Sequence, residues 1–277
     1  MGLTSGNVPD ALRAATDRLG CSSDTARLDA EVLMAHVLGL SRGEMLMRHR
    51  DVSVPADFAA LVARRAAGEP VAHIIGTRDF WTITLAVTPD TLIPRPDSET
   101  LIEAAVDHFG ARGPQTVLDL GTGSGALLLA ALAQWPQARG LGIDASAAAL
   151  AVARDNAARL DLGARADFRI GDWAKGVEGA FDLMLINPPY IGVDEPLSGD
   201  VLREPASALF AGADGLDDYR RIVPDLPRLI APGGMAAIEI GHRQGESVGA
   251  LVAAQGLNIA IRRDLAELDR CIVATRT

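Results

Sequence analysis

The feature that most constrains the fold is an alternation of apolar runs and amphipathic segments that begins after Gly113-Pro114. The apolar runs are short and nearly continuous, as in strands buried on both faces of a parallel sheet. Strands are expected at Thr116–Asp119, Gly140–Asp144, Ala166–Gly171, Phe181–Ile186, Met235–Ile240, Asn258–Arg262 and Arg270–Thr275. Helices are expected at Gly125–Gln134, Ser146–Leu160, Gly215–Leu229 and Gln244–Ala254. The pattern predicts an α/β fold whose seven-stranded sheet is covered by helices on both faces.

The first 70 residues have helical periodicity instead. Helices are expected at Val8–Leu19, after Asp24 or Thr25, at Arg42–Arg48 and at Ala56–Ala67. Gly68-Glu69-Pro70 would end the last of them. This is the pattern of a small helical bundle that serves either to recognise a substrate or only to stabilise the rest of the chain.

A different pattern joins the two regions. Apolar side chains alternate from Phe80 to Val87 and return at Thr91–Ile93, with Pro89-Asp90 between the runs, which predicts a β-hairpin turning there. Ile93-Pro94-Arg95-Pro96 is then a rigid extended segment, and Asp97 or Ser98 would cap a helix through Phe109. We therefore expect a helical domain at 1–77, a hairpin linker at 78–96 and an α/β domain at 97–277.

Composition narrows the compartment and the chemistry. Of the 277 residues 48% are hydrophobic and 22% are charged, and no apolar run approaches the roughly 20 residues of a membrane helix. Cys21 and Cys271 lie at opposite ends of the sequence, and the histidines are scattered. We expect a cytoplasmic protein without a signal peptide, a disulfide framework or a bound metal.

The charge distribution argues against a nucleic-acid partner. Residues 1–85 hold 9 Arg and 10 Asp or Glu, a net charge of −1, so the remainder carries −9 of the total −10. Binding to a phosphate backbone depends on clustered Lys and Arg, and the sequence has no such cluster.

A glycine-rich turn follows the first strand of the alternating region. Gly121-Thr122-Gly123-Ser124-Gly125 lies between that strand and the next helix, so its backbone can pass close to a ligand at a helix N-terminus. Dinucleotide-binding folds use G-x-G-x-x-G, and the third glycine position of that pattern is Ala126 here. Since Ala is tolerated at that position, the loop alone leaves the cofactor class open.

Polar residues also end the next two strands. Asp144 is placed to accept hydrogen bonds from the two hydroxyls of a ribose, although an acidic residue there also suits a helix cap. Asp172 could accept an adenine amino group while Trp173 packs on the ring, or Trp173 could simply belong to the core. Ligands of open parallel sheets bind at the carboxyl ends of the strands, so these residues together predict a nucleoside-containing cofactor.

Asn187-Pro188-Pro189-Tyr190 follows the fourth strand and indicates the other reactant. The Asn187 side-chain oxygen and the Pro188 carbonyl can each accept one hydrogen of a planar NH2 group. Two consecutive prolines remove backbone donors that would compete for those acceptors, and Tyr190 offers a ring face. The alternative is a Pro-Pro strand terminator beside a surface tyrosine.

These residues resemble a Rossmann-like methyltransferase that binds S-adenosylmethionine. More narrowly, the chain resembles the protein-glutamine N5-methyltransferases of the PrmC/HemK family, which modify peptide chain release factors. The Asn-Pro-Pro-Tyr turn is shared with adenine-N6 DNA methylases, whereas Ile93-Pro94-Arg95-Pro96 after a helical domain is more specific. The matching segments are Glu69–Gly76, Phe80-Trp81, Leu92–Asp97, the glycine loop, Asn187–Ile191, Glu204-Pro205, Ala208–Phe210, Asp214–Leu216 and Pro232–Gly234.

The resemblance implies a division of roles within the site. Gly121, Thr122, Gly123, Ser124, Gly125, Asp144, Asp172, Trp173 and Asn187 would bind S-adenosylmethionine. Asn187, Pro188, Pro189 and Tyr190 would hold the glutamine of the release factor's Gly-Gly-Gln motif, and Asn187, Pro188 and Tyr190 would carry the reaction. Arg95 could join the site or only form an ion pair.

Alternative substrates remain open at this stage. A glutamine methyltransferase that acts on a ribosomal protein would carry the same motifs. An adenine-N6 nucleic-acid methyltransferase would present the same planar NH2 group, but it must also grip phosphates. A non-catalytic cofactor-binding protein would have no need of the Asn-Pro-Pro-Tyr turn.

Overall fold

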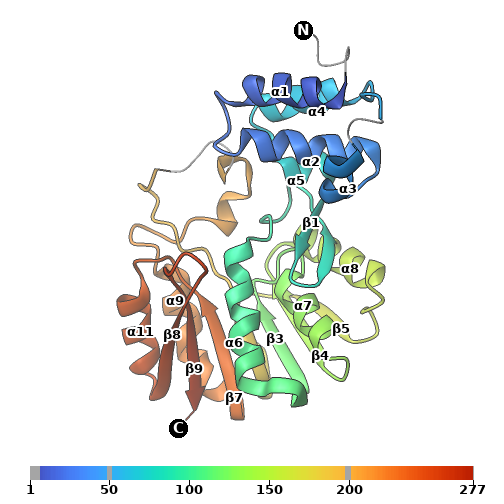
Figure 1. Cartoon of the computed structure of the whole chain (residues 1–277). Helices are drawn as coiled ribbons and strands as arrows, with labels where there is room; N and C mark the ends of the chain where they lie inside the picture. The colour runs from blue at the N-terminus through green and yellow to red at the C-terminus, as the bar shows by residue number, and fades with distance from the viewer. Residues whose placement is uncertain (1–6, 49–51, 197–200, 277) are drawn as a thin grey trace. The chain divides into compact units, whose positions relative to one another are not determined.

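A computed structural model describes residues 7–48, 52–196 and 201–276 (Figure 1). The described chain divides into two compact units, each with its own hydrophobic core. The helical unit contains the chain up to Thr77 together with Val201–Arg203. All other described residues from Arg78 onward form the sheet unit.

Five helices and a short 3-10 turn form the described part of the helical unit, and the predicted bundle is confirmed. They are α1 (Val8–Leu19), α2 (Ala26–Leu38), α3 (Arg42–Arg48), α4 (Phe58–Ala66), α5 (Val71–Ile75) and η3 (Val201–Arg203). Their apolar faces meet in a core that includes Leu12, Leu33 and Phe58. Asn7 caps α1 by accepting a hydrogen bond from the Asp10 amide at 2.9 Å. The helix expected from Ala56 begins only at Phe58, one turn after Pro55.

The hairpin exists, but its predicted turn is wrong. β1 (Thr77–Phe80) and β2 (Ile83–Ala86) reverse at Trp81-Thr82, and Thr91–Ile93 is not a strand. Trp81 adopts a φ of 53°, which bulky residues rarely do and which side-chain alternation therefore does not signal. Tertiary hydrogen bonds hold it there: its amide donates to Glu99 Oε1 at 2.9 Å and its indole donates to Gln134 Oε1 at 3.0 Å.

The hairpin is joined to the sheet unit by a buried amide. Asn156 Oδ1 accepts the Ala86 N–H at 2.7 Å, and Asn156 Nδ2 donates to the carbonyls of Ala86 and Ser124, each at 3.0 Å. One side chain thus connects β2 with the glycine loop, and residues 78–96 group with the sheet unit.

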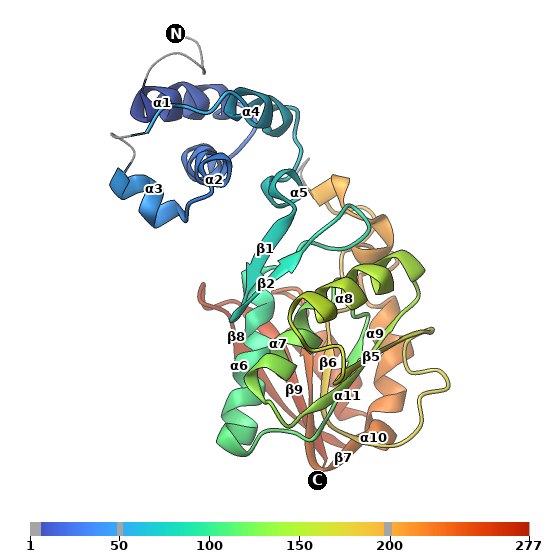
Figure 2. The ribbon, with the colours of Figure 1, turned by 90° about the vertical axis from the view of Figure 1, so that its right-hand side faces the viewer.

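A seven-stranded sheet organises this unit and confirms the predicted fold class (Figures 1 and 2). Its strands are β3 (Thr116–Leu120), β4 (Arg139–Asp144), β5 (Ala166–Ile170), β6 (Phe181–Ile186), β7 (Ile230–Glu239), β8 (Leu257–Arg263) and β9 (Asp269–Arg276), in the order β5-β4-β3-β6-β7-β9-β8. β9 is antiparallel to both of its neighbours, and the pairings from β5 through β7 are parallel. β3 lies between β4 and β6, so the strand order reverses there. A crevice at the carboxyl ends of β3 and β6 follows from this reversal.

Helices cover both faces of the sheet. α6 (Glu99–Phe109), α7 (Ala126–Gln134) and α8 (Ala147–Arg159) contribute to one core cluster, and α9 (Asp217–Ile222), α10 (Leu226–Leu229) and α11 (Gly245–Ala253) to the other. Short 3-10 turns lie at η1 (Pro96–Ser98), η2 (Gly110–Arg112), η4 (Ala206–Ala208) and η5 (Val223–Asp225). The single helix expected at Gly215–Leu229 is wrong, because η5 separates α9 from α10. Pro224 and Pro227 cannot donate the backbone hydrogen bonds that a continuous helix needs.

A buried ion pair stabilises the helical unit. Arg65 Nε lies 2.6 Å from Asp29 Oδ2, and only 5% and 9% of their side chains are exposed. The hydroxyls of Ser23 and Thr25 also donate to the Asp29 carboxylate, at 2.8 and 2.9 Å. The buried carboxylate of Asp29 thus has hydrogen-bond partners on both of its oxygens.

Arg65→Met should destabilise the helical unit by about 3 kcal/mol, because it leaves Asp29 buried without its counter-charge. Hydrogen exchange of the α2 amides, combined with urea titration, measures the loss. Arg13→Met is the control, since the Arg13–Asp10 pair is largely exposed and should contribute less than about 0.5 kcal/mol. Equal protection in both variants would show that the buried pair contributes nothing.

Candidate active site

A cavity of about 600 Å³ opens in the sheet unit at the carboxyl ends of β3, β4, β5 and β6. This volume suits a small-molecule ligand. It brings together the predicted residues Gly121, Thr122, Gly123, Ser124, Asp144, Asp172, Trp173, Asn187 and Pro189. Three other predicted site residues, Gly125, Pro188 and Tyr190, do not line it.

The glycine loop is held by the neighbouring strand end. The amides of Gly121 and Thr122 both donate to the Ile143 carbonyl, at 2.9 and 3.0 Å, and the Gly123 amide donates to Asp144 Oδ2 at 2.8 Å. Gly121 has a φ of 75°, and a Cβ there would meet Trp173 Cζ3 at 2.9 Å. The loop can thus present its backbone directly to the cavity.

Gly125 has a packing role instead. It is the N-terminal cap of α7 at a φ of 83°, and a Cβ there would press on Leu129 and on Ala153 of α8. The absence of a side chain at Gly125 lets α7 and α8 approach each other. Gly125 therefore faces this helix contact and not the cavity.

The Asp144 side chain combines two structural hydrogen bonds. Besides accepting from Gly123, it accepts from the Ser146 amide at 2.8 Å through Oδ1. The helix cap itself is Ser146, whose hydroxyl accepts from the Ala149 amide at 3.1 Å. Each carboxylate oxygen has a further lone pair, so Asp144 can still accept from a ligand hydroxyl.

Trp173 closes the cavity over the glycine loop. Its backbone has a φ of 51°, and its indole N–H donates to Asp218 Oδ1 at 2.9 Å. Asp172 forms an ion pair with Arg221, which also pairs with Asp218. A carboxylate network at the end of β5 and the start of α9 therefore fixes the indole.

Asn187 follows β6 and enters the cavity wall. Its Nδ2 donates to the Ser98 hydroxyl at 3.3 Å. Within the described parts of the chain, its Oδ1 has no hydrogen-bond partner. Pro189 lies in the same wall. The amide oxygen is therefore free to accept a hydrogen from a ligand.

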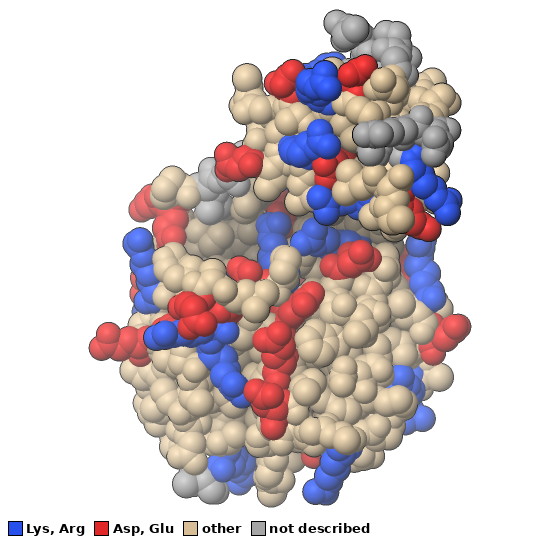
Figure 3. Space-filling model, viewed as in Figure 1, with Lys and Arg blue, Asp and Glu red and all other residues tan. Residues whose placement is uncertain are grey.

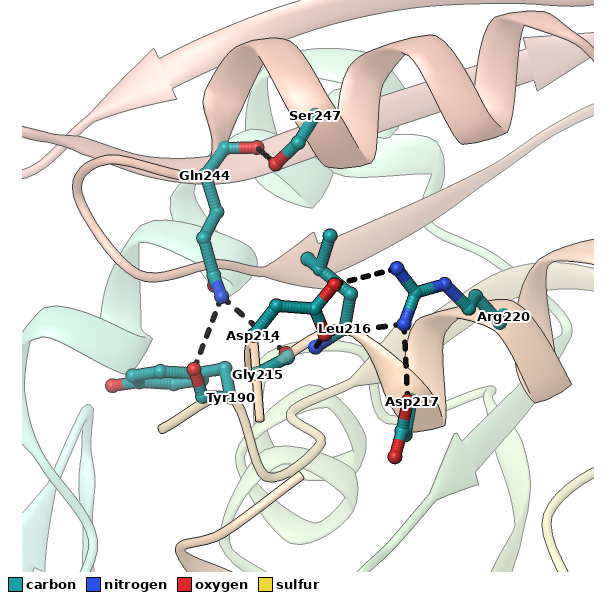
Figure 4. Close-up of polar contacts among 8 residues, drawn as sticks. All are labelled: Tyr190, Asp214, Gly215, Leu216, Asp217, Arg220, Gln244 and Ser247. Carbon is teal, nitrogen blue, oxygen red and sulfur yellow. Dashed lines mark hydrogen bonds and ion pairs between the residues drawn. The ribbon is translucent and has the colours of Figure 1, made fainter. Parts of the chain in front are cut away.

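The Tyr190 backbone is held by the Gln244 side chain (Figure 4). Gln244 Nε2 donates to the carbonyls of Tyr190 and Gly215, at 3.0 and 3.3 Å, while Gln244 Oε1 accepts the Gly241 amide at 2.9 Å. A Cβ at Gly215 would lie 2.2 Å from the Tyr190 carbonyl oxygen, so only glycine fits. The hydroxyl of Tyr190 donates to Glu239 Oε1 at 3.4 Å.

Arg95 lines the cavity and forms an ion pair, so the structure shows both features that its position suggested. Its guanidinium contacts Glu204 Oε1, and Glu204 Oε2 accepts the Ile93 amide at 2.8 Å. Glu204 is buried and links the extended proline segment to the rest of the sheet unit.

Comparison with known proteins identifies the family. Residues 10–76 match the PrmC N-terminal domain, and residues 98–205 match the methyltransferase small domain. A release factor glutamine methyltransferase from Rhodospirillum rubrum is 47% identical over 90% of this chain and 79% of its own length. One from Cereibacter sphaeroides is 45% identical over 96% of this chain and 97% of its own length.

The chain belongs to the release factor glutamine methyltransferase family. Its fold is also that of a methyltransferase from Pyrococcus furiosus, with a TM-score of 0.53 and 18% identity over 76% of this chain and 95% of that one. The chain is thus a methyltransferase.

Three residues that line the cavity or support its walls were missed by sequence reasoning. Asp97 or Ser98 was expected to cap α6, but the Ser98 side chain makes no capping hydrogen bond and accepts one from Asn187 instead. Asp119 and Glu239 were taken only as strand residues, and each is 1% exposed. The available signal was an acidic residue inside an otherwise apolar strand, which is costly unless it has a purpose.

Asp119 supports the glycine loop from below. Its Oδ2 accepts the Thr122 hydroxyl at 2.6 Å, whereas Oδ1 is buried without a partner in the described chain. Burial raises the pKa of Asp119 to about 7, against the lowering effect of the Thr122 hydrogen bond. The methyltransferase therefore keeps a destabilising acid under its loop.

Asp119→Asn should stabilise the protein at pH 8 and leave its stability nearly unchanged at pH 4. In the folded state the Asp119 carboxyl stays protonated up to about pH 7, whereas in the unfolded state an Asp loses its proton near pH ~3.9. Stability therefore falls as pH rises between these values, by up to about 4 kcal/mol. Urea titrations at both pH values check this, with exposed Asp167→Asn as the control. A gain at pH 4 equal to that at pH 8 would contradict the assignment.

Proposed function

We propose that the chain transfers a methyl group from S-adenosylmethionine to the side-chain amide nitrogen, N5, of the glutamine in the Gly-Gly-Gln motif of peptide chain release factors. The observation that carries the proposal is the Asn187 side chain. Ser98 holds its nitrogen, and its oxygen is available in a cavity shared with the glycine loop. The sequence relatives, which are named for this reaction, support the choice of substrate.

The residues of the cavity fit the cofactor. Gly121 to Ser124 would hold it through their backbone, Asp144 through the ribose hydroxyls, and Asp172 and Trp173 at the adenine. The absence of side chains at Gly121 and Gly123 provides the close backbone approach that such a ligand needs. When bound, S-adenosylmethionine supplies a strongly electrophilic methyl group on a sulfonium.

The protein's own task is to orient a poor nucleophile. An amide nitrogen is unreactive because its lone pair is delocalised into the carbonyl. Asn187 Oδ1 and the Pro188 carbonyl would accept its two hydrogens, and these hydrogen bonds strengthen as the nitrogen becomes positive. The extra proton can leave to water after transfer, so the site needs no dedicated base.

Tyr190 would act beside the substrate rather than under the cofactor. It does not line the cavity described above, and its hydroxyl and carbonyl are both engaged by the protein. We infer that Tyr190 and Pro189 form the rigid wall against which the glutamine side chain lies.

The helical unit, residues 1–77, would recognise the release factor, with residues 78–96 as the connection to a methyltransferase domain at 97–277. Its match to the PrmC N-terminal domain supports this role. Substrates of this kind occur in the cytoplasm, where the enzyme would act. No helix among the described residues is long and apolar enough to cross a membrane.

Surface charge favours a protein substrate over a nucleic acid. On the face in Figure 3, basic and acidic side chains of the described residues are interspersed, and the basic ones do not gather into one area. With a net charge of −10, the chain would repel a phosphate backbone. A ribosomal-protein glutamine would present the same amide, so it is the alternative that the assay must exclude.

The decisive assay measures transfer of radiolabelled methyl groups from S-adenosylmethionine to purified release factors. Wild-type factor should be labelled, and factor with Gln→Ala in its Gly-Gly-Gln motif should not. Ribosomal proteins and duplex DNA are the competing substrates. Label on either of these in place of the release factor would refute the proposed substrate.

A protein that begins at Arg78 tests the helical unit. It should still bind S-adenosylmethionine, because the cavity residues all belong to the sheet unit. Methylation of the release factor should be lost, since the docking surface is gone. Undiminished methylation would leave the helical unit a stabilising role only.

Asn187→Ala should lower turnover by ~10²-fold or more, because it removes a preorganised acceptor from the transition state. The dissociation constant for S-adenosylmethionine, measured by calorimetry, should change much less. Asn258→Ala is the matched control, since Asn258 is exposed on β8. Turnover of Asn187→Ala within threefold of wild type would rule this mechanism out.

A further inference from the structure

A carboxyl group lies buried behind the Asn-Pro-Pro-Tyr turn. Glu239, at the end of β7, is 1% exposed, and its Oε2 has no partner of ordinary hydrogen-bond geometry in the described chain. Its Oε1 accepts the Tyr190 hydroxyl at 3.4 Å. A buried acid with an incompletely satisfied carboxyl is costly to the fold, and no packing need explains it.

Ser98 connects this carboxyl with Asn187. Since the Ser98 hydroxyl accepts a hydrogen bond from Asn187 Nδ2, its own proton must be donated elsewhere. We assign that proton to the Glu239 carboxyl, because both side chains are buried, Glu239 Oε2 has no hydrogen-bond partner at ordinary distance in the described chain, and Ser98 lowers the pKa of Glu239.

The direction of these hydrogen bonds matters for catalysis. The oxygen and nitrogen ends of an asparagine amide have nearly the same shape, so hydrogen-bond partners decide which end faces the cavity. A hydroxyl that donates to a carboxylate can only accept from the amide. Asn187 must therefore turn its nitrogen toward Ser98 and its oxygen toward the ligand.

We propose that Glu239 is a positioning residue that orients both ends of the Asn-Pro-Pro-Tyr turn, Asn187 through the Ser98 hydroxyl and Tyr190 directly. This role of Glu239 rests on the proposed function, which supplies the identity of the methyl acceptor. Glu239 touches neither reactant. Glu239 keeps Asn187 Oδ1 directed at the substrate as an acceptor. Without Glu239, the Asn187 amide can rotate by 180° and present its NH2 group to the NH2 group of the substrate, and the two groups repel each other.

Charged and titratable groups surround Glu239 from every side. Arg270 and Cys271 face it from β9, Tyr219 from α9, Tyr190 from the Asn-Pro-Pro-Tyr turn, and Asp97 from η1. Burial raises the pKa of Glu239 to about 7, which Ser98 and Arg270 oppose and Asp97 assists. Only the ionised carboxylate can accept from the hydroxyls of both Tyr190 and Ser98, so the proposed arrangement is complete only above that pH.

Glu239→Gln tests the role because its shape is conserved. Turnover should fall on the order of tenfold, less than for Asn187→Ala because Glu239 acts through Ser98. Wild-type turnover should decline below about pH 7 as Glu239 becomes protonated, and this decline should be absent from Glu239→Gln. Cofactor affinity should not change, and the melting temperature at pH 8 should be equal or higher, since a buried charge is removed. If Glu239 had a purely structural role, Glu239→Gln would lower the melting temperature and leave turnover and its pH dependence unchanged.

Cys271→Ala is the matched packing control. Cys271 lies directly opposite Glu239 in the sheet and is equally buried, but it contacts neither reactant. It should lower the melting temperature and leave turnover within twofold. Ser98→Ala should lose turnover as Glu239→Gln does, and the double variant should lose no more than either alone. Additive losses would overturn the connection through Ser98.

A spectroscopic measurement separates this role from the choice of substrate. The chain has four asparagines, so 15N-asparagine labelling yields four side-chain amide signals, and Asn187→Ala assigns the one that matters. In Glu239→Gln the Asn187 NH2 signal should shift and exchange faster with water, while Cys271→Ala should leave it in place. An unchanged signal refutes the role of Glu239. Failure to methylate release factors, with a shifted signal, refutes only the substrate.

Discussion

The structure of the site depends on one constraint, that β3 and β6 are adjacent parallel strands and therefore end at the same edge of the sheet. Backbone pairing of Leu120 with Ile186 places the glycine loop and the Asn-Pro-Pro-Tyr turn one step beyond the same point of the register. The reaction needs an electrophile and an amide nitrogen next to each other. Parallel pairing provides this proximity before any side chain takes part.

Around this edge, the protein retains interactions that cost stability. Asp119 and Glu239 are buried acids whose pKa values are each raised to about 7 by burial, and each has an oxygen without a partner in the described chain. Asp119 supports the loop through Thr122, and Glu239 faces the turn through Tyr190. Such groups are tolerated where they hold something in a defined orientation. Their positions under the two ligand-facing segments are therefore informative about function.

Much of the fold and the site could be predicted from patterns within short stretches of sequence. The boundaries of β6 and α1 are those expected, because an apolar run and a helical period are local properties. The hairpin turn was misplaced, because the conformation of Trp81 is held by Glu99 and Gln134, which are distant in sequence. Gly125 was assigned to the cofactor; in the structure it does not line the cavity, and a Cβ there would press on Leu129 and Ala153. The hairpin turn and the surroundings of Gly125 are thus decided in part by residues distant in sequence, Glu99 and Gln134 for the turn and Ala153 for Gly125.

The sequence by itself determined which chemical groups this protein has, in what order, and at which strand ends they occur. The glycine loop, Asp144 and the Asn-Pro-Pro-Tyr turn were visible because each is a contiguous motif with its own local physics. Tertiary structure alone decided what surrounds them: Ser98 against Asn187, Glu239 behind Tyr190, and Gln244 on the Tyr190 carbonyl. The residues in these three contacts are 89, 49 and 54 positions apart in the sequence, respectively. Hydrogen bonds over such separations leave no periodicity in the sequence, so only the folded chain could show them.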